Sequence, residues 1–288
     1  MTERMDLGNR KDSRLARRDR VTVAFILSCK HSGSTWLNLV LGSHTWAYNL
    51  GEYHRPFTIP GHVACRLCEA DGLDACTMLH GIERVKMEDA YHFAATRSGK
   101  SVLIDASKQL DWCKNFLNVD HIDARLIHLV RHPCGYLESQ SRRSKASFAE
   151  LLDRWEATNR TIDSFVSGSG APSVLAYYDD LADAPAEHMP AVCELLGGPY
   201  EPAALRYWDF PHHGLGGNGA ASVYLKSRPN AQFLTGDDAF YAEITDRPSQ
   251  ADRRWTERLP QGLCRTALAS PYVRDLEQRL GRNLTEAP

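Results

Sequence analysis

The 288-residue sequence lacks several features that would assign it to a class directly. No apolar run approaches the roughly 20 residues that a membrane-spanning helix needs, and the amino-terminal stretch has no apolar core like that of a signal peptide. The formal net charge is only −2, so no global electric field would attract nucleic acid. We therefore expect neither a membrane nor a nucleic-acid partner, and we expect local basic clusters to form any anion site.

Cysteine is present, but its spacing gives no obvious disulfide framework in a chain of this length. The eight cysteines are at positions 29, 65, 68, 76, 113, 134, 193 and 264. The composition, 43% hydrophobic and 24% charged, is typical of globular proteins. The length allows one large α/β domain or two small ones. Residues 1–20 are polar and rich in charge, so we expect a mobile tail before a domain at 21–288.

The stretch from Val21 to Ser43 combines a strand, a turn and a helix start. Val21 to Leu27 is apolar and rich in β-branched residues, which predicts a strand buried on both faces. A short polar turn follows, and Ser34 or Thr35 can cap a helix whose apolar residues recur at helical spacing. Because loop N–H groups and the helix dipole converge on one spot, this stretch predicts an anion site.

The loop does not follow the Walker pattern, which ends in Gly-Lys-Ser/Thr. Its basic residues instead precede the glycine, in the order Lys30-His31-Ser32-Gly33-Ser34-Thr35-Trp36. This order resembles the 5′-phosphosulfate loop of sulfotransferases that use 3′-phosphoadenosine 5′-phosphosulfate (PAPS). The resemblance implies that these seven residues bind the sulfuryl donor. The family usually has Lys or Arg directly before Ser-Gly, where this chain has His31. Either Lys30 or His31 therefore supplies the loop cation, and we favour Lys30.

A second match follows another predicted strand, at 124–130. Arg131 comes directly after this strand, and Ser139 lies eight residues later in a helix that Pro133 can begin. The planar guanidinium of arginine meets phosphate oxygens bidentately. The pair resembles the 3′-phosphate site of PAPS-dependent sulfotransferases. Two matches in the family's order, the loop at 30–36 and this pair, are much less likely to arise by chance than one match.

A further predicted strand, 172–178, leads into Tyr178-Asp179-Asp180-Leu181, which is similar to the family's Tyr-Glu-Asp-Leu. The resemblance implies that Tyr178 lies against the adenine and that Trp36 packs on the opposite side, because aromatic faces stack on bases. The glycine-rich segment 210–230 resembles a family loop that closes over the nucleotide. The family's arginine after Asn218 is absent, so Lys226 or Arg228 is expected to supply a contact to the 3′-phosphate.

Candidates for catalytic roles follow the helix that Ser34 or Thr35 would cap and the predicted strand at 101–105. The resemblance implies that Glu52 in Gly51-Glu52 is the base that takes a proton from an acceptor hydroxyl, with His54 as second choice. Lys108 in Asp105-Ala106-Ser107-Lys108 would neutralise charge on the sulfuryl oxygens or the leaving phosphate. A carboxylate in a surface loop and a solvated lysine are the simpler explanations of these two residues.

The segment 61–80 contains Cys65-x2-Cys68, Cys76 and His80, which could hold zinc as a Cys3His site. The second half lacks the paired spacing of strong zinc motifs, so we assign no metal ligands. The alternative is an insertion that shapes the acceptor side, because similar cysteine-bearing insertions occur at this place in bacterial sulfotransferases.

The resemblance covers most of the chain from Val21 to about Arg228 and is to the soluble bacterial PAPS-dependent sulfotransferases. It implies a single α/β domain whose mostly parallel sheet is flanked by helices in a P-loop-like fold. It implies transfer of a sulfuryl group from PAPS to a hydroxyl of a small-molecule acceptor (a phenol, an alcohol or a sugar). The product would be adenosine 3′,5′-bisphosphate (PAP), no metal would be required, and we expect a cytoplasmic enzyme.

Two other classes fit the same residues, and the oligomeric state is open. One is a nucleoside or sugar kinase with an atypical phosphate loop, which would bind ATP with magnesium. The other is a non-catalytic nucleotide-binding protein.

Overall fold

The computed structural model describes residues 20–59, 61, 65, 67–68, 76–219, 221, 223 and 248–284. Apart from Arg20, the expected tail at 1–20 lies outside the described residues. The two candidates for the second 3′-phosphate contact, Lys226 and Arg228, also lie outside them.

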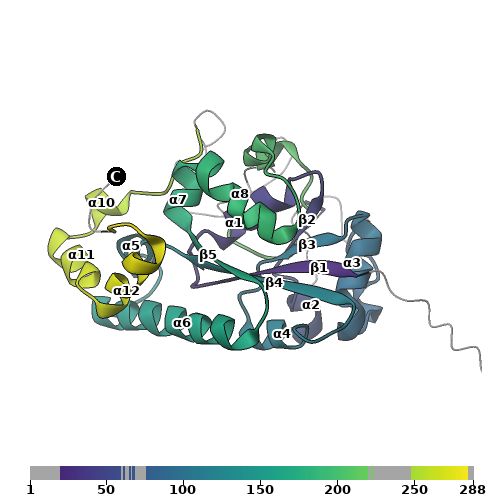
Figure 1. Ribbon diagram of the computed structural model, residues 1–288, viewed down its shortest axis with the longest axis horizontal. Helices are drawn as coiled ribbons and strands as arrows, with labels where there is room; N and C mark the ends of the chain where they lie inside the picture. The colour runs from purple at the N-terminus through teal and green to yellow at the C-terminus, as the bar shows by residue number, and fades with distance from the viewer. Residues whose placement is uncertain are drawn as a thin grey trace, which may run out of the picture.

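Strands and helices alternate along much of the described chain (Figure 1). The strands are β1 (Val21–Ser28), β2 (Ala47–Gly51), β3 (Val102–Asp105), β4 (Ile122–Val130) and β5 (Ser173–Tyr177). The first helices are α1 (Ser34–Gly42), α2 (Arg55–Thr58), α3 (Ala90–Ser98), α4 (Leu110–Lys114), α5 (Pro133–Ser141) and α6 (Phe148–Ser169). The later helices are α7 (Tyr178–Asp183), α8 (Pro185–Leu196), α10 (Trp255–Arg258), α11 (Gln261–Leu268) and α12 (Pro271–Leu280). Short 3-10 helices span Ile82–Arg84, Met87–Asp89, Pro202–Leu205 and Tyr207–Asp209.

The strands form one sheet in the order β2-β3-β1-β4-β5. Every strand pairing within this sheet is parallel, which confirms the expected α/β class. Four strands lie close to where the sequence predicts them, but β2 was not predicted. Its sequence, Ala-Tyr-Asn-Leu-Gly, lacks the β-branched run that marks a buried strand.

The register of the sheet decides which loops meet at its carboxyl edge. Ser28 pairs with Leu129 and Val130 with Tyr177, so the loop after β1 lies beside Arg131, which lies beside Tyr178. On the other side, Phe25 pairs with Asp105 and Asp105 with Gly51. The segments after β2 and β3 therefore leave the sheet side by side. Functional groups in open parallel sheets gather at this edge.

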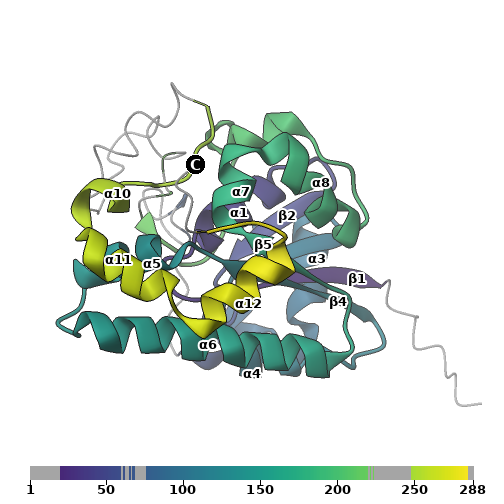
Figure 2. The same ribbon diagram turned by 60° about the vertical axis from the view of Figure 1, so that its left-hand side comes forward.

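Helices cover both faces of the sheet, as Figures 1 and 2 show from two directions. Along β1, alternate side chains point to opposite faces, so Phe25 joins the core under α3, α4 and α6, whereas Ile26 joins the core under α1 and α8. The longest helix, α6, begins with a complete capping box between Ser147 and Glu150, as the sequence predicts. Both faces are thus buried, as parallel sheets require.

A third hydrophobic cluster lies beyond the end of the sheet, where α11 and α12 pack on α5 and α6. It contains a disulfide between Cys134 at the start of α5 and Cys264 in α11, which are 130 residues apart. The spacing of the cysteines did not predict this pair. The other six cysteines, all among the described residues, are buried and are not in disulfides.

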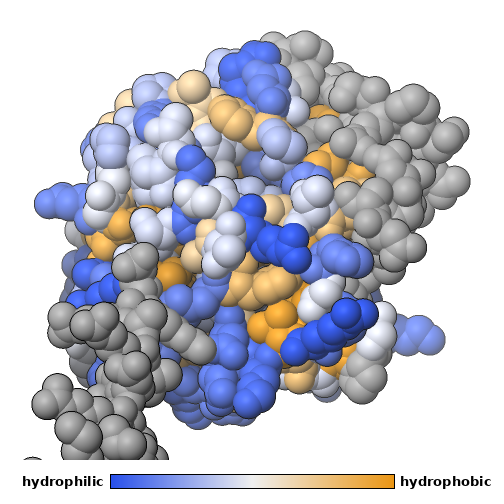
Figure 3. Space-filling view, turned by 90° about the vertical axis from the view of Figure 1, so that its right-hand side faces the viewer, coloured by the Kyte–Doolittle hydropathy of each residue, from blue (hydrophilic) through white to orange (hydrophobic). Residues whose placement is uncertain are grey.

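The described residues expose few large hydrophobic side chains. Among the described residues, Ile59, Met87 and Leu263 are the large hydrophobic residues classed as exposed. The face drawn in Figure 3 shows hydrophilic residues interspersed with smaller hydrophobic areas. No helix in the described part of the chain has the length and the hydrophobicity that crossing a bilayer requires.

Candidate functional site

A cavity of about 630 Å³ lies where the loops after the strands converge. This volume lies within the usual range for small-molecule sites. Its lining carries two carboxylates, Glu52 and Asp252, against eight Lys and Arg residues. The eight basic residues are Lys30, Arg55, Lys108, Arg131, Arg142, Arg143, Arg206 and Arg254. A chain with a net charge of −2 thus gathers positive charge around one cavity, which suits a polyanionic ligand.

The loop after β1 forms the predicted anion cradle. Gly33 has a left-handed backbone (φ +88°) and is the N-cap of α1, so neither Ser34 nor Thr35 caps the helix as expected. Both are instead the first residues of the helix, and both line the cavity. Their N–H groups belong to the helix terminus, where an anion is favoured. Ser32 is buried, and its hydroxyl has no hydrogen-bond partner among the described residues.

His31 is held in an uncommon conformation and in a positive environment. Its φ is +62°, in the left-handed region that few residues other than glycine adopt. Burial and the nearby cations Arg143, Arg131, Lys108 and Lys30 lower the pKa of His31 to about 4. The imidazole is therefore neutral at neutral pH before an anion binds. Lys30 also lines the cavity, so both candidates for the loop cation lie at the same site.

Arg131 lies where the sequence predicts it, directly after β4, and links several parts of the cavity. It is 6% exposed. Its Nη1 donates to the carbonyl oxygen of His31 at 2.9 Å, and its Nη2 lies 3.2 Å from a carboxylate oxygen of Asp252. Its guanidinium also lies over the Tyr178 ring, 5.4 Å from the centroid. Arg131 thus joins the cradle to the expected adenine contact.

Ser139 lines the same cavity from α5, and the structure adds a cation that the sequence prediction missed. Arg143 donates from Nη1 to the Ser139 hydroxyl oxygen at 3.0 Å and to its carbonyl oxygen at 2.7 Å. The signal was available, because Arg143 follows Ser139 by four residues and this spacing brings side chains together on a helix. Asp252 and Arg254 were also missed, since they come from a distant part of the sequence.

Tyr178 and Trp36, which were expected on opposite sides of the adenine, are in direct contact with each other. Their rings meet edge to face, with centroids 5.6 Å apart and planes at 88°. A base that lies flat on one ring would therefore meet the edge of the other, and the expected sandwich is not formed. The Tyr178 ring also packs on Gly33, where an added Cβ would overlap two of its ring carbons. The ring and the cradle are therefore in direct contact.

Glu52 lies at the end of β2, between two cations. Lys108 Nζ is 3.0 Å from Glu52 Oε1, and Arg55 Nε donates to Oε2 at 2.6 Å. Partial burial opposes ionisation of Glu52, but Lys108 and Arg55 outweigh it, so the pKa of this carboxyl lies below its usual value. The structure thus brings together Glu52 and Lys108, which the sequence separates by 56 residues.

His54 lines the cavity beside this group. It is 9% exposed, and its backbone N–H donates to the Ser107 hydroxyl at 3.1 Å. Its Nδ1 is buried and has no hydrogen-bond partner among the described residues. Burial lowers the pKa of His54, so the ring is neutral at neutral pH and can accept a proton.

Buried polar groups fix these segments behind the cavity. Asp105 is 1% exposed and accepts hydrogen bonds from Tyr91 Oη at 2.7 Å, Trp112 Nε1 at 3.0 Å and the Ser107 N–H at 2.6 Å. Its pKa is raised by burial, although these bonds act against the rise. The network sets the direction of the chain from Asp105 to Lys108, whose own φ of +60° is uncommon for lysine. Such satisfied networks rigidify the groups that they hold.

The first part of the glycine-rich segment lies against the cradle. The Asn218 N–H donates to Thr35 Oγ1 at 3.0 Å. Gly217 (φ +87°) also packs on Thr35, and Gly216 (φ +59°) packs on Glu52 and Arg55. The segment therefore touches both the anion cradle and the expected base. Its later part, with Lys226 and Arg228, is outside the described residues.

The possible zinc ligands differ in one residue, the histidine, from the set that the sequence suggested. Cys65, Cys68 and Cys76 come together, but the imidazole beside them belongs to His213. His80, the histidine that the sequence offered as a possible fourth ligand, is exposed. The tertiary structure explains the different histidine, because the loop with His213 crosses over the cysteine segment although it lies 137 residues after Cys76 in the sequence. In the part of the chain that the structure describes, none of these four ligands lines the cavity.

The five-stranded parallel sheet, with helices on both faces and a loop that leads from its first strand into its first helix, defines an α/β protein. The model of the sulfotransferase family matches residues 24–202, well over half of the chain, and the chain belongs to that family. No curated protein sequence is similar enough to count as a match.

Two solved structures with the same fold are themselves sulfotransferase domains. The first is from the curacin biosynthetic pathway, with a TM-score of 0.58 and 17% identity, and the match covers 94% of this chain and all of that domain. The second is from the olefin synthase of Synechococcus PCC 7002, with a TM-score of 0.52 and 20% identity, covering 95% of this chain and 98% of that domain. At these identities the likeness is one of fold.

Proposed function

We propose that this protein transfers a sulfuryl group from PAPS to a hydroxyl of a small-molecule acceptor and releases PAP. One observation carries the proposal. Two anion sites, the cradle at residues 30–35 and the pair Arg131 and Ser139, line one cavity and are joined by the hydrogen bond from Arg131 to His31. PAPS has negative charge at both its 5′ and 3′ positions, so it suits a cavity that carries two anion sites.

In this proposal the donor is bound at both ends. The N–H groups of the cradle, with Lys30, Ser34 and Thr35, hold the phosphosulfate, since a helix terminus and a cation both favour an anion. Arg131 and Ser139 hold the 3′-phosphate, with Arg143 as a further cation. The adenine lies on Tyr178. Selection of PAPS over ATP then follows from the 3′ site, because ATP has no phosphate there.

The transfer step needs a base and stabilisation of negative charge. The acceptor oxygen attacks sulfur, and a new S–O bond forms as the bond from sulfur to the bridging phosphate oxygen breaks. The acceptor proton goes to Glu52, which is ionised at neutral pH because its pKa is lowered. Lys30 and Lys108 offset the charge that develops on the sulfuryl and bridging oxygens. Protonation of Glu52 also weakens its ion pair with Lys108, which leaves more of the lysine charge for the leaving PAP.

The lining of the cavity also includes apolar side chains. Ile59, Leu205 and Trp208 are among the lining residues. Their presence supports an acceptor that carries an apolar or aromatic portion beside its hydroxyl group. A screen of hydroxyl compounds with labelled PAPS identifies that acceptor.

Calorimetry with the purified protein tests the proposal. PAP should bind in EDTA at least tenfold more tightly than ATP, and Arg131→Ala should weaken PAP binding at least tenfold. Arg160→Ala, an exposed arginine on α6, is the matched control and should change nothing. Equal affinity for ATP and PAP would contradict the proposal, and a requirement for magnesium would favour a kinase. PAP binding without turnover on any hydroxyl acceptor would indicate a non-catalytic nucleotide-binding protein.

A further inference from the structure

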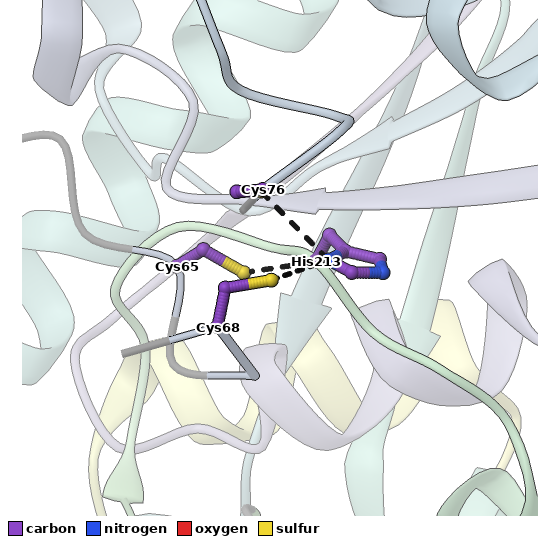
Figure 4. Close-up of side chains that lie close together, drawn as sticks. All are labelled: Cys65, Cys68, Cys76 and His213. Carbon is purple, nitrogen blue, oxygen red and sulfur yellow. Dashed lines mark hydrogen bonds between the residues drawn. The ribbon is translucent and has the colours of Figure 1, made fainter. Parts of the chain in front are cut away.

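Three cysteines and a histidine surround one point beside the sheet edge, outside the cavity (Figure 4). His213 Nδ1 lies 3.6 Å from Cys65 Sγ, 3.3 Å from Cys68 Sγ and 3.8 Å from Cys76 Sγ. All four ligand atoms lie within 4.8 Å of one another. The three cysteines are buried, and His213 is partly buried.

These separations match the edges of a tetrahedron around one metal ion. Zinc bonds of about 2.3 Å to sulfur and about 2.0 Å to nitrogen at tetrahedral angles give S···N edges of about 3.5 Å and S···S edges of about 3.8 Å. The three S···N distances, 3.3 to 3.8 Å, bracket the first value. Small side-chain movements bring the widest pair, at most 4.8 Å apart, to the second. Thiolate ligands favour soft metals, and a tetrahedral set of three cysteines and one histidine is typical of structural zinc.

We propose that Cys65, Cys68, Cys76 and His213 bind one zinc ion as a structural site. Four protein ligands complete the tetrahedral coordination, so no position remains for a substrate or a reactive water. The site therefore takes no part in sulfuryl transfer. The proposal does not depend on the identity of the donor or of the acceptor.

The local chain conformation prepares the cysteines for this role. Cys65 and Cys68 lie at the two ends of a turn closed by the hydrogen bond from the Cys68 N–H to the Cys65 carbonyl at 3.0 Å. Cys76 begins the next turn, where the His80 N–H donates to the Cys76 carbonyl at 2.9 Å. The two-residue spacing of the first pair is typical of zinc sites. The fourth ligand, His213, directly follows His212. The side chain of His212 is 0% exposed, and its ring nitrogens lie 2.7 Å from Asn49 Oδ1 and 2.7 Å from the Tyr207 carbonyl oxygen.

The ion would fasten the glycine-rich segment to the edge of the sheet. Leu215, two residues after His213, forms isolated β-bridges with both Cys65 and Gly51. Its N–H donates to the Leu50 carbonyl at 2.9 Å, and its carbonyl accepts from the Glu52 N–H at 2.6 Å. β2 is an edge strand, so these bonds cover part of its open edge. The ion thus holds the backbone of Glu52 in place.

The same segment then reaches the cradle, where the Asn218 N–H donates to Thr35 Oγ1. Asn218 follows His213 by only five residues, so a loop anchored by metal at one end meets the anion site at the other. We therefore expect loss of zinc to affect both Glu52 and the cradle, although no ligand touches the donor.

Metal analysis of the intact protein, purified without chelators, tests the site directly. We expect one equivalent of zinc per chain. His213→Ala and the double variant Cys68→Ser/Cys76→Ser should each retain less than a tenth of an equivalent. His80→Ala and Cys113→Ser are the matched controls, a histidine and a buried cysteine outside the cluster, and each should retain a full equivalent.

Less than a tenth of an equivalent in the wild-type protein would overturn the proposal, and this measurement does not depend on any variant folding. Retention of zinc by His213→Ala together with its loss from His80→Ala would overturn the ligand set. A disulfide between Cys65 and Cys68 in peptide mapping of the wild-type protein would also overturn it. Because zinc content is measured without substrate, a failure here is distinct from a failure to bind PAP.

A cobalt-substituted sample gives a second readout. Replacement of zinc by cobalt should produce the intense visible absorption of tetrahedral cobalt with thiolate ligands in wild type and in His80→Ala. The absorption should be lost in Cys68→Ser/Cys76→Ser. Removal of the metal should also lower the temperature midpoint of unfolding of the wild-type protein, because metal that binds the native state stabilises it. An unchanged midpoint would contradict the role given to the ion.

Discussion

The carboxylate of Asp252 lies 3.2 Å from the guanidinium of Arg131, the group that we propose for the 3′-phosphate. Arg254 also pairs with Asp252, from Nε to Oδ1 at 2.8 Å and from Nη2 to Oδ2 at 2.8 Å. Burial opposes ionisation of Asp252, but Arg254 and Arg131 outweigh it and lower the pKa to about 2. Asp252 is thus a negatively charged partner of Arg131 throughout the neutral pH range.

Asp252→Asn should strengthen PAP binding about threefold to tenfold, because a fixed negative charge next to the 3′-phosphate site is removed while the shape is kept. Calorimetry at low and moderate ionic strength measures the effect, which should shrink as salt rises. Asp183→Asn is a matched control, since Asp183 pairs with Arg253 and does not line the cavity in the described part of the chain. Weaker binding by Asp252→Asn would mean that the carboxylate orients Arg131 rather than competes with the phosphate.

Lys30→Ala should lower turnover at least tenfold, whereas His31→Asn should lower it less than threefold at pH 7. The reason is that the pKa of His31, lowered to about 4, leaves the ring neutral above about pH 5. Asparagine suits the comparison because it tolerates the left-handed backbone at this position. The rate of the wild-type enzyme should therefore not fall between pH 6 and 8 through loss of a proton from His31.

A pH profile of both variants provides the check. If the wild-type rate falls between pH 6 and 8 and His31→Asn removes that fall, then bound donor raises the pKa of His31 and the imidazolium is the loop cation. A loss of less than threefold for Lys30→Ala would give the same answer.

The sequence predicted much of the sheet, since β1, β3, β4 and β5 are marked by short apolar runs. It predicted the approach of Arg131 to the cradle only through the family resemblance, and the register of β1 with β4 supplies the physical reason. β2 was missed because its own sequence, with Asn49 and a terminal Gly51, does not indicate a strand. Contacts with the rest of the fold stabilise it. Asn38 holds it in place, donating to the Ile104 carbonyl at 2.8 Å and accepting from the Gly51 N–H at 3.3 Å.

The residues that sequence reasoning could not find are those brought in from far along the chain. His213 replaces His80 among the cysteines because the loop after Tyr207 crosses the edge of the sheet, and no local pattern encodes that crossing. Asp252 reaches Arg131 across 121 residues. Local periodicity reports on neighbours within one element, so such contacts become visible only when the elements are packed.

Glu52→Gln should lower turnover at least a hundredfold and leave PAP affinity within threefold, because general bases contribute about 10²- to 10⁴-fold. His54→Asn should lower turnover less than tenfold. The pH profile separates catalysis from packing, since the acidic limb of kcat/KM should be lost in Glu52→Gln and kept in His54→Asn. Unchanged unfolding midpoints in both variants exclude a loss of structure. A larger effect of His54→Asn than of Glu52→Gln would make the neutral imidazole of His54 the base.

The disulfide between Cys134 and Cys264 tests the proposed cytoplasmic location. Disulfides persist in oxidising compartments, and cytoplasmic thiols are kept reduced. Protein alkylated at the moment of cell lysis should therefore carry both residues as thiols, and the disulfide should form only after exposure to oxidant. Oxidation should then stabilise the fold, by at most about 5 kcal/mol for a loop of this length. Cys264→Ser should show no such gain. A disulfide already complete at lysis would contradict the cytoplasmic location.

Gly33→Ala should weaken PAP binding at least tenfold, because Gly33 combines two constraints in the cradle. Its φ of +88° is strained for any residue with a Cβ, and that Cβ would overlap the Tyr178 ring. Gly99→Ala is the matched control, since it has the same left-handed backbone (φ +66°) but nothing within 4 Å of the added Cβ. It should cost only the strain, about 1 kcal/mol, with PAP affinity unchanged. If Gly33→Ala bound PAP as tightly as Gly99→Ala, contact between the cradle and the Tyr178 ring would not be needed for binding the nucleotide.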